Sequence, residues 1–91
     1  MLRIHHGKLT NKEVNLVVEG DLLGPWVDEL LKTCDPFLGN GRKLSIDLSG
    51  VLFADRAGVA LLRYFKGKQA QLNCSPFLIE LMRDQEPEER G

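Results

Sequence analysis

The chain has 91 residues, of which 43% are hydrophobic and 27% charged, and its 12 basic and 13 acidic residues leave a formal charge of −1. One globular domain accounts for this length, and the near-zero charge lacks the concentrated positive field that nucleic-acid binding needs. The apolar runs are far shorter than the roughly 20 residues of a membrane span, and the N-terminus has no apolar signal core. We therefore expect a cytoplasmic protein with no nucleic-acid partner and no membrane insertion.

The cysteines and histidines do not form a ligand set. Cys34 and Cys74 lie far apart with no CxxC spacing, which indicates reduced thiols that serve as small apolar side chains. His5 and His6 are adjacent in an expected strand and should point to opposite faces, so they cannot share one ion. We expect no metal ion and no cofactor.

The first expected elements are two strands and a helix. Alternating apolar and polar residues predict a strand over residues 2–6, and residues 14–20 are β-branched and apolar, which predicts a second strand in a hairpin with the first. Pro25 then begins a helix, since proline at the first helical position loses only an N–H group without an intrahelical partner. The helix should end at Pro36, and the glycine-containing turn at residues 39–41 is interpreted as a plain loop. The inner face of the helix is expected to contain Val27, Leu30, Leu31 and Cys34.

The middle of the chain predicts a third strand and a second helix. Apolar and polar residues alternate over residues 43–49, and Gly50 closes the strand. Asp55 is a good N-cap for the helix that follows, and Gly67 is expected to terminate it in the left-handed conformation. The apolar stripe of this helix is predicted to contain Ala57, Gly58, Leu61, Leu62 and Phe65.

The last elements are a short strand over residues 70–74 and a third helix. Ser75 and Pro76 provide an N-cap and a proline at the first helical position. Residues 84–91 are acidic and contain no apolar side chain, so we predict a frayed tail after a single domain of residues 1–83. The inner face of the third helix is expected to contain Phe77, Leu78, Leu81 and Met82.

The order of elements is strand, strand, helix, strand, helix, strand, helix. Strands that alternate with helices favour parallel, right-handed crossovers, whereas the opening hairpin adds one antiparallel strand. We therefore predict an α/β domain with a four-stranded mixed sheet and three helices.

The feature of the sequence that most suggests catalysis is the pair of carboxylates at Asp47 and Asp55. Of two nearby carboxylates, one can act as a general acid and the other as a general base. Asp55 is already accounted for as an N-cap, and no histidine, cysteine nucleophile or phosphate-binding loop accompanies Asp47. We expect a protein that is not an enzyme.

The second helix carries the most informative surface. At about 100° per residue its core stripe is centred near Leu61 and Phe65, which leaves an opposite face with three cations and an exposed aliphatic residue. Such a face is either simply solvated or a protein-docking surface, where arginine is enriched, and the residues alone leave both interpretations open. The face comprises Arg56, Val59, Ala60, Arg63 and Lys66, with Lys68 just beyond.

Residues 44–62 resemble the signature of the STAS family, which includes cytoplasmic domains of sulfate transporters and bacterial anti-sigma factor antagonists. The string D-L-S-G-V-x-F-x-D-x-x-G begins at Asp47 and ends at Gly58, and the length and element order also fit an isolated STAS domain. The resemblance implies a partner-switching protein that binds an anti-sigma kinase through the loop and helix around this motif. In such systems the kinase phosphorylates the hydroxyl residue after the motif aspartate, and the added charge breaks the complex.

The chain departs from the family pattern where the switch is expected. Asp55 and Gly58 match the motif, whereas Arg56 stands at the phosphoacceptor position and Ala57 replaces a second hydroxyl residue. Arginine keeps its positive charge and is no substrate for a serine kinase, so no phosphorylation is expected there. We hypothesise a constitutive STAS adaptor, resembling an anti-sigma factor antagonist in transcription regulation, that docks its partner through residues 53–66. The expected partner contacts are Asp55, Arg56, Ala57, Gly58, Val59 and Arg63.

Two other functions stay open. Small STAS subunits also bind the ATPase of bacterial lipid-transport ABC systems, so the partner could be such an ATPase instead of an anti-sigma factor or its kinase. The fold could also hold a small molecule, such as a nucleotide or a lipid, in a cleft beside Asp55.

Overall fold

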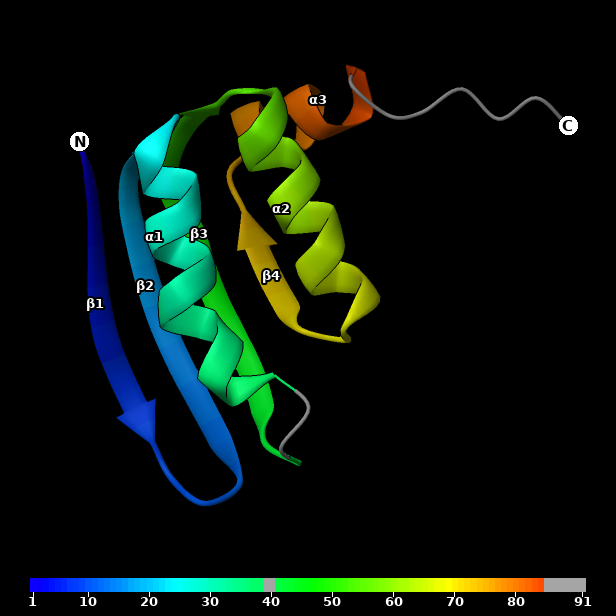
Figure 1. The fold of residues 1–91 in the computed structure, drawn as a ribbon. Helices are drawn as coiled ribbons and strands as arrows, with labels where there is room; N and C mark the ends of the chain where they lie inside the picture. The colour runs from blue at the N-terminus through cyan, green and yellow to red at the C-terminus, as the bar shows by residue number, and fades with distance from the viewer. Residues whose placement is uncertain (39–40, 85–91) are drawn as a thin grey trace, which may run out of the picture.

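The computed structural model describes residues 1–38 and 41–84, and its elements follow the expected order (Figure 1). Of the predicted tail at residues 84–91, only Asp84 is described, and Gly39 and Asn40 of the predicted loop also lie outside the described residues. The elements are β1 (Leu2–Leu9), β2 (Glu13–Leu22), α1 (Pro25–Cys34), the short 3-10 helix η1 (Asp35–Phe37), β3 (Lys43–Ala54), α2 (Arg56–Gly67), β4 (Gln71–Cys74) and α3 (Pro76–Asp84).

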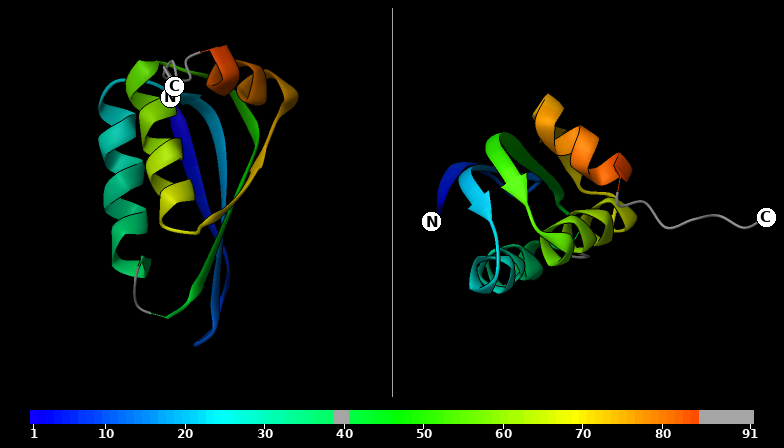
Figure 2. Two further views of the ribbon diagram at one scale, coloured as in Figure 1. Left: turned by 90° about the vertical axis from the view of Figure 1, so that its right-hand side faces the viewer. Right: turned by 90° about the horizontal axis from the view of Figure 1, so that it is seen from above.

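The four strands form one sheet in the order β1-β2-β3-β4. β1 is antiparallel to β2, whereas β3 is parallel to both of its neighbours. The predicted α/β fold with a mixed four-stranded sheet and three helices is therefore confirmed. The two parallel crossovers place α1 and α2 side by side over one face of the sheet, and α3 lies across the end at which β3 and β4 finish (Figure 2).

The core lies between the sheet and the helices α1 and α2. Successive side chains of a strand point to opposite faces, so the period of two in the sequence directs one set of apolar residues toward the helices. Leu30 and Cys34 of α1 and Leu62 and Phe65 of α2 are fully buried against them. The buried residues of β2 and β3 on this side are Val14, Leu16, Val18, Leu22, Leu44, Ile46 and Leu48.

β3 is longer than the sequence predicts. It continues past Gly50, where its end was expected, to Ala54. Its pairing with β2 shifts register twice, the second time between Gly20 and Asp21 of β2. At each shift β3 contributes one residue more than β2, as in a β-bulge, and the regular alternation of inward and outward side chains is lost. The chain therefore reaches α2 through irregular strand rather than through a loop.

The end of α2 also differs from the prediction. Gly67 is the last helical residue, and the left-handed conformation expected there is adopted by Gln69, with a φ of 68°. The Ala70 N–H donates to the Phe65 carbonyl (3.0 Å) and the Gln69 N–H donates to the Lys66 carbonyl (2.9 Å). These two bonds form a Schellman cap, which satisfies the free carbonyls of the last turn. The cap is the expected one, but it lies two residues further along the chain.

α3 begins as predicted, with Ser75 as its N-cap. The Ser75 Oγ accepts from the Leu78 N–H (3.1 Å) and donates to the Val51 carbonyl (2.9 Å), which fixes α3 to the last part of β3. Leu78 is fully buried, but Phe77, predicted on the inner face, is 67% exposed. α3 covers only the end of the sheet. Fewer of its apolar residues are therefore buried than its amphipathic pattern predicts.

Candidate functional site

Asp55 connects two separate segments at the point where α2 begins. Its Oδ1 accepts from the Gly58 N–H (2.8 Å), and its Oδ2 accepts from the Gly24 N–H (3.0 Å) in the connection between β2 and α1. Its own N–H donates to the Leu22 carbonyl (3.1 Å). The predicted N-cap is therefore confirmed, and the same carboxylate also holds the preceding connection against α2.

These hydrogen bonds set the charge state of Asp55. The N–H groups of Gly24 and then Gly58 lower the pKa of its carboxyl below the ordinary value, because they stabilise the ionised form. Asp55 is thus an anion at neutral pH whose oxygens both face backbone donors. This arrangement makes Asp55 a structural anchor for the motif.

Gly58 explains why the motif has a glycine at this position. A Cβ atom built on Gly58 would lie 2.6 Å from the Leu22 carbonyl oxygen and 3.1 Å from the Ala54 Cβ. The first turn of α2 therefore packs directly on the backbone at the end of β2, and only a residue without a side chain allows this approach. Gly58 is buried, as the predicted core stripe requires.

The prediction that Val59 is exposed is wrong, because Val59 is only 2% exposed. α1 lies beside α2 (Figure 1), so burial of α2 extends around its flank as well as over the face toward the sheet. Ala57, which was predicted in the core stripe, is exposed instead, together with Arg56 and Ala60. The exposed face of α2 is therefore rotated about the helix axis relative to the predicted face. It includes Ala57, whereas Val59 belongs to the core.

Arg63 does not share the outer face with Arg56. It is half-buried on the flank of α2 next to α3, where its guanidinium donates a hydrogen bond to the Met82 carbonyl. Lys66 lies on the same flank, and both residues line a cavity between α2, β4 and α3. The sequence predicts one cationic surface on α2. In the structure, Arg56 lies on the exposed face, whereas Arg63 and Lys66 lie on the flank beside the cavity.

Asp47 and Asp55 do not form a catalytic pair. Asp47 pairs with Val17 of β2, whereas Ala54, directly before Asp55, pairs with Leu22, so five strand residues, or roughly 17 Å, separate the two positions along the sheet. The Asp47 Oδ1 accepts from the Ser49 N–H (3.0 Å) and from the Asn73 Nδ2 (3.3 Å). The Ser49 N–H is the main reason that the pKa of Asp47 lies below its ordinary value. Each carboxylate is thus committed to its own backbone contacts.

Within residues 1–38 and 41–84, no group of three His, Cys, Asp or Glu side chains is placed to hold a metal ion. His5 pairs with Glu19, with 3.5 Å between its Nε2 and the carboxylate, on the edge of the sheet. No helix in the described part of the chain is long and apolar enough to cross a bilayer.

One of the solved structures similar to this chain is that of the anti-sigma factor antagonist SpoIIAA in its unphosphorylated form. The fold is STAS-like. The two chains superpose with a TM-score of 0.61 at 18% sequence identity, and the match covers 89% of this chain and 82% of that one. The resemblance inferred from the motif is thereby confirmed at the level of the fold. Neither the protein-family models nor the curated protein sequences match this chain.

Sequence reasoning missed three exposed apolar residues at this end of the STAS-like fold. Leu52 and Phe53 at the end of β3 are 60% and 46% exposed, and Phe77 lies in the first turn of α3, which the Ser75–Val51 hydrogen bond fixes to the same part of β3. Exposed apolar groups of this size are typical of contact surfaces. The run of apolar residues before Asp55 is a visible signal, and regular alternation points Phe53 outward. The bulges that turn Leu52 outward as well cannot be read from the sequence.

Proposed function

We propose that this chain is a non-enzymatic adaptor that binds a partner protein at the end of the domain where α2 begins. The observation that carries the proposal is the group of exposed apolar residues at the end of β3 and the start of α3, two segments that the Ser75–Val51 hydrogen bond joins. Asp55 and Gly58 shape this end without offering free groups, and Val59 lies beneath it. We define the docking surface as Leu52, Phe53, Arg56, Ala57 and Phe77.

The chemistry of the docking surface indicates the kind of partner. Protein interfaces combine a desolvated apolar centre with a polar rim in which arginine is over-represented. No carboxylate of the described residues lies within ion-pair distance of Arg56 (the ion pairs are elsewhere). A partner that fits would place an apolar patch on Leu52 and Phe53 and a carboxylate near Arg56.

Arg56 also supports binding that does not depend on phosphorylation. In the family pattern a kinase adds a dianion at this position, but arginine holds a permanent positive charge there and Ala57 offers no hydroxyl. The adaptor would therefore stay in its binding-competent state. Incubation of the purified chain with a partner kinase and ATP should leave its intact mass unchanged, and a stoichiometric phosphate on any residue would contradict this part of the proposal.

The docking surface is tested by affinity capture with the full chain as bait. Wild type is compared with the Arg56→Glu and Leu52→Asp variants, and with Arg3→Glu, which changes an exposed arginine on the far edge strand β1. Quantitative mass spectrometry should find a protein that wild type and Arg3→Glu retain equally and that the other two variants lose at least tenfold. Equal retention by all four baits would rule out this surface.

The identity of the captured protein separates the two adaptor functions. An anti-sigma factor or its kinase would support the regulator of transcription, whereas the ATPase of an ABC lipid transporter would support the transport subunit. Genes for either partner beside the coding sequence would point the same way. The third possibility, a small molecule beside Asp55, has less support because both oxygens of that carboxylate already accept backbone hydrogen bonds.

A further inference from the structure

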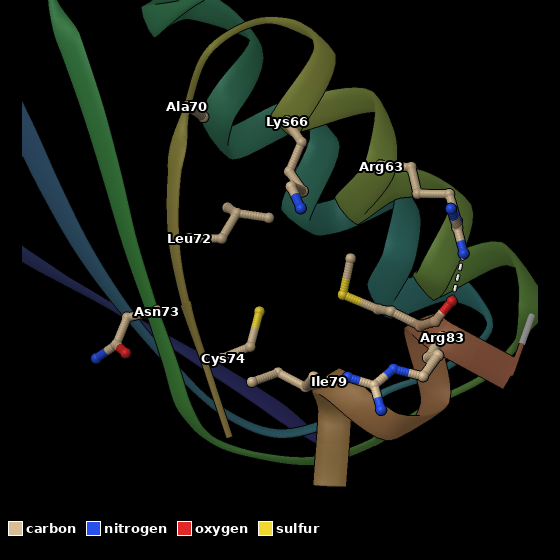
Figure 3. A pocket seen from close by; sticks show the side chains of 9 residues that line it. Arg63, Lys66, Ala70, Leu72, Asn73, Cys74, Ile79 and Arg83 are labelled. Carbon is tan, nitrogen blue, oxygen red and sulfur yellow. Dashed lines mark hydrogen bonds between the residues drawn. The ribbon is translucent and has the colours of Figure 1, made fainter. Parts of the chain in front are cut away.

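A cavity of about 750 Å³ lies between the second half of α2, β4 and α3 (Figure 3). Leu72 and Cys74 of β4 point into it, whereas Asn73 between them points away to the other face of the sheet. Ile79 and Met82 of α3 also line it. The volume is within the range of small-molecule sites, about 300–1,000 Å³, and the floor of the cavity is apolar.

Three cationic side chains surround this apolar floor, namely Arg63, Lys66 and Arg83. Arg63 donates one hydrogen bond to the Met82 carbonyl, which leaves most of the five guanidinium N–H donors available. Among the described residues, Arg83 has an exposed ion pair with Glu80, at 3.7 Å, and such pairs contribute little. No described carboxylate is within ion-pair distance of Arg63 or Lys66. The rim therefore carries positive charge that the described part of the chain does not neutralise.

Lys66 brings this charge close to the cavity wall. Burial raises the pKa of the Cys74 thiol, and the positive charge of Lys66 acts in the opposite direction because it stabilises the thiolate. Figure 3 shows the Lys66 side chain directed from α2 into the cavity above Leu72. An anionic group between Lys66 and Arg83 would relieve the mutual repulsion of the cations without displacing any hydrogen bond of the fold.

We infer that this cavity binds a single-chain amphiphile with an anionic head group, such as a long-chain carboxylate. Its head would lie between Lys66 and Arg83, and its alkyl chain would cover Leu72 and Ile79. None of the described residues that line the cavity is aromatic, so a nucleotide base would have no stacking partner among them. An acidic helix about 10 Å across would fill this volume with roughly two turns, which is little for a stable protein interface.

This ligand site is distinct from the docking surface and does not rest on the proposed function. None of the residues of the docking surface lines the cavity. The Arg56→Glu variant should therefore bind the amphiphile as wild type does, and the variants of the cavity should retain the partner protein. Failure of one proposal leaves the other standing.

The direct test is an NMR titration of the isotope-labelled full chain with dodecanoate, below the concentration at which it forms micelles. We expect saturable shifts of the amide signals of β4 and α3, at least tenfold weaker binding of dodecan-1-ol, and no binding of acetate. Equal affinity for dodecanoate and dodecan-1-ol would overturn the role of the cationic rim. Shifts confined to other elements, or binding of an acidic amphipathic peptide here in the absence of dodecanoate binding, would overturn the site.

Four variants locate the ligand. Lys66→Gln should weaken dodecanoate binding about tenfold, while Lys68→Gln, the same change just beyond α2, should leave it unchanged. Ile79→Asp places a carboxylate on the apolar floor and should abolish binding, while Phe77→Asp, at a position of α3 that is exposed and outside the cavity, should not. Both Ile79 and Phe77 are exposed enough for the fold to persist, and wild-type amide spectra outside α3 would verify this. Equal dodecanoate affinity for the two lysine variants, or for the Ile79 and Phe77 variants, would contradict the inference.

Discussion

The two arginines of α2 differ more in their surroundings than the sequence suggests. Arg56 begins the helix, is exposed, and has no described carboxylate within ion-pair distance. Arg63, two helical turns further on, is half-buried and donates to the Met82 carbonyl of α3. Their positions on the helix predict one docking face for both. The helical period alone does not determine the role of an arginine. The element that packs on the flank of the helix decides whether the guanidinium is free to bind a partner or forms a hydrogen bond within the fold.

The same contrast exists between Asp55 and Arg56, which are adjacent in the chain. The Asp55 carboxylate turns inward and accepts two backbone N–H groups, whereas the Arg56 side chain is exposed. One end of α2 thus contains a scaffold, formed by Asp55 and Gly58, and a contact surface that the scaffold supports. Substitutions in the scaffold should change stability, and substitutions in the surface should change binding.

The largest expected effect is that of Gly58→Ala. A new Cβ would lie 2.6 Å from the Leu22 carbonyl oxygen, so the start of α2 must move away from β2. We expect a loss of about 3 kcal/mol in the free energy of unfolding, at the upper end of overpacking effects. Gly67→Ala is the matched control, because nothing lies near that position and alanine favours a helix by up to about 1 kcal/mol. Urea unfolding that shows equal stability for the two variants would contradict the close packing at Gly58.

Asp55→Ala should have the next largest effect, because it removes the acceptor of two backbone N–H groups. We expect a loss of about 1.5 kcal/mol at neutral pH, as for other N-cap substitutions. The folded state lowers the pKa of Asp55, so its contribution is present above the unfolded value of about 3.9 and is lost as the pH falls further.

The stability difference between wild type and Asp55→Ala should therefore shrink when unfolding is measured at successively lower pH values below about 4. Glu80→Ala serves as the control, because Glu80 lies beyond the first turn of α3 and makes an exposed ion pair with Arg83 at 3.7 Å. That variant should lose less than about 0.5 kcal/mol. A difference for Asp55→Ala that stays constant down to the acid transition would show that its charge is not responsible.

The fold could be predicted from the sequence because each element has its own local signal. The period of two in the strands, the period of 3.6 in the helices, and the caps at Asp55 and Ser75 all depend on residues close together in the chain. Their order then limits the topology to a mixed sheet with right-handed crossovers. The structure extends the first three strands, to Leu9, Leu22 and Ala54, and adds the short helix η1, but it leaves the kind and order of the predicted elements unchanged.

The candidate site could be predicted only in part, because its contact surface depends on packing between distant segments. Asp55 and Gly58 followed from local spacing. The burial of Val59 requires knowledge that α1 packs on the flank of α2, and the position of Arg63 requires the carbonyl of Met82 in α3. The exposure of Leu52 arises from bulges in the β2–β3 ladder, since regular alternation after Leu48 would point it inward.

Arg63→Met tests whether Arg63 stabilises the fold, and its expected loss of stability is smaller than that of Asp55→Ala. Methionine keeps the apolar stem but cannot donate to the Met82 carbonyl, so α3 should pack less firmly on α2. We expect a loss of about 1 kcal/mol, the typical net contribution of one hydrogen bond, because Arg63 is only half-buried. Arg3→Met, which removes an exposed ion pair with Glu19 at 3.9 Å and lies on the strand β1 rather than at a helix end, should cost less than about 0.5 kcal/mol. Equal losses in thermal unfolding would mean that Arg63 is not a structural residue.

Arg56→Glu should have the smallest effect on stability, and it separates the two roles most clearly. Arg56 occupies the first turn of α2, where the partial positive charge of the helix N-terminus repels a cation and attracts a carboxylate. We therefore expect the variant to gain about 0.5 kcal/mol in unfolding free energy at low ionic strength, and to lose the gain in high salt. The same change should weaken the captured partner at least tenfold. A variant that is more stable and yet binds less would show that Arg56 is kept at an unfavourable position by its partner, whereas unchanged binding would leave Arg56 without a role in docking.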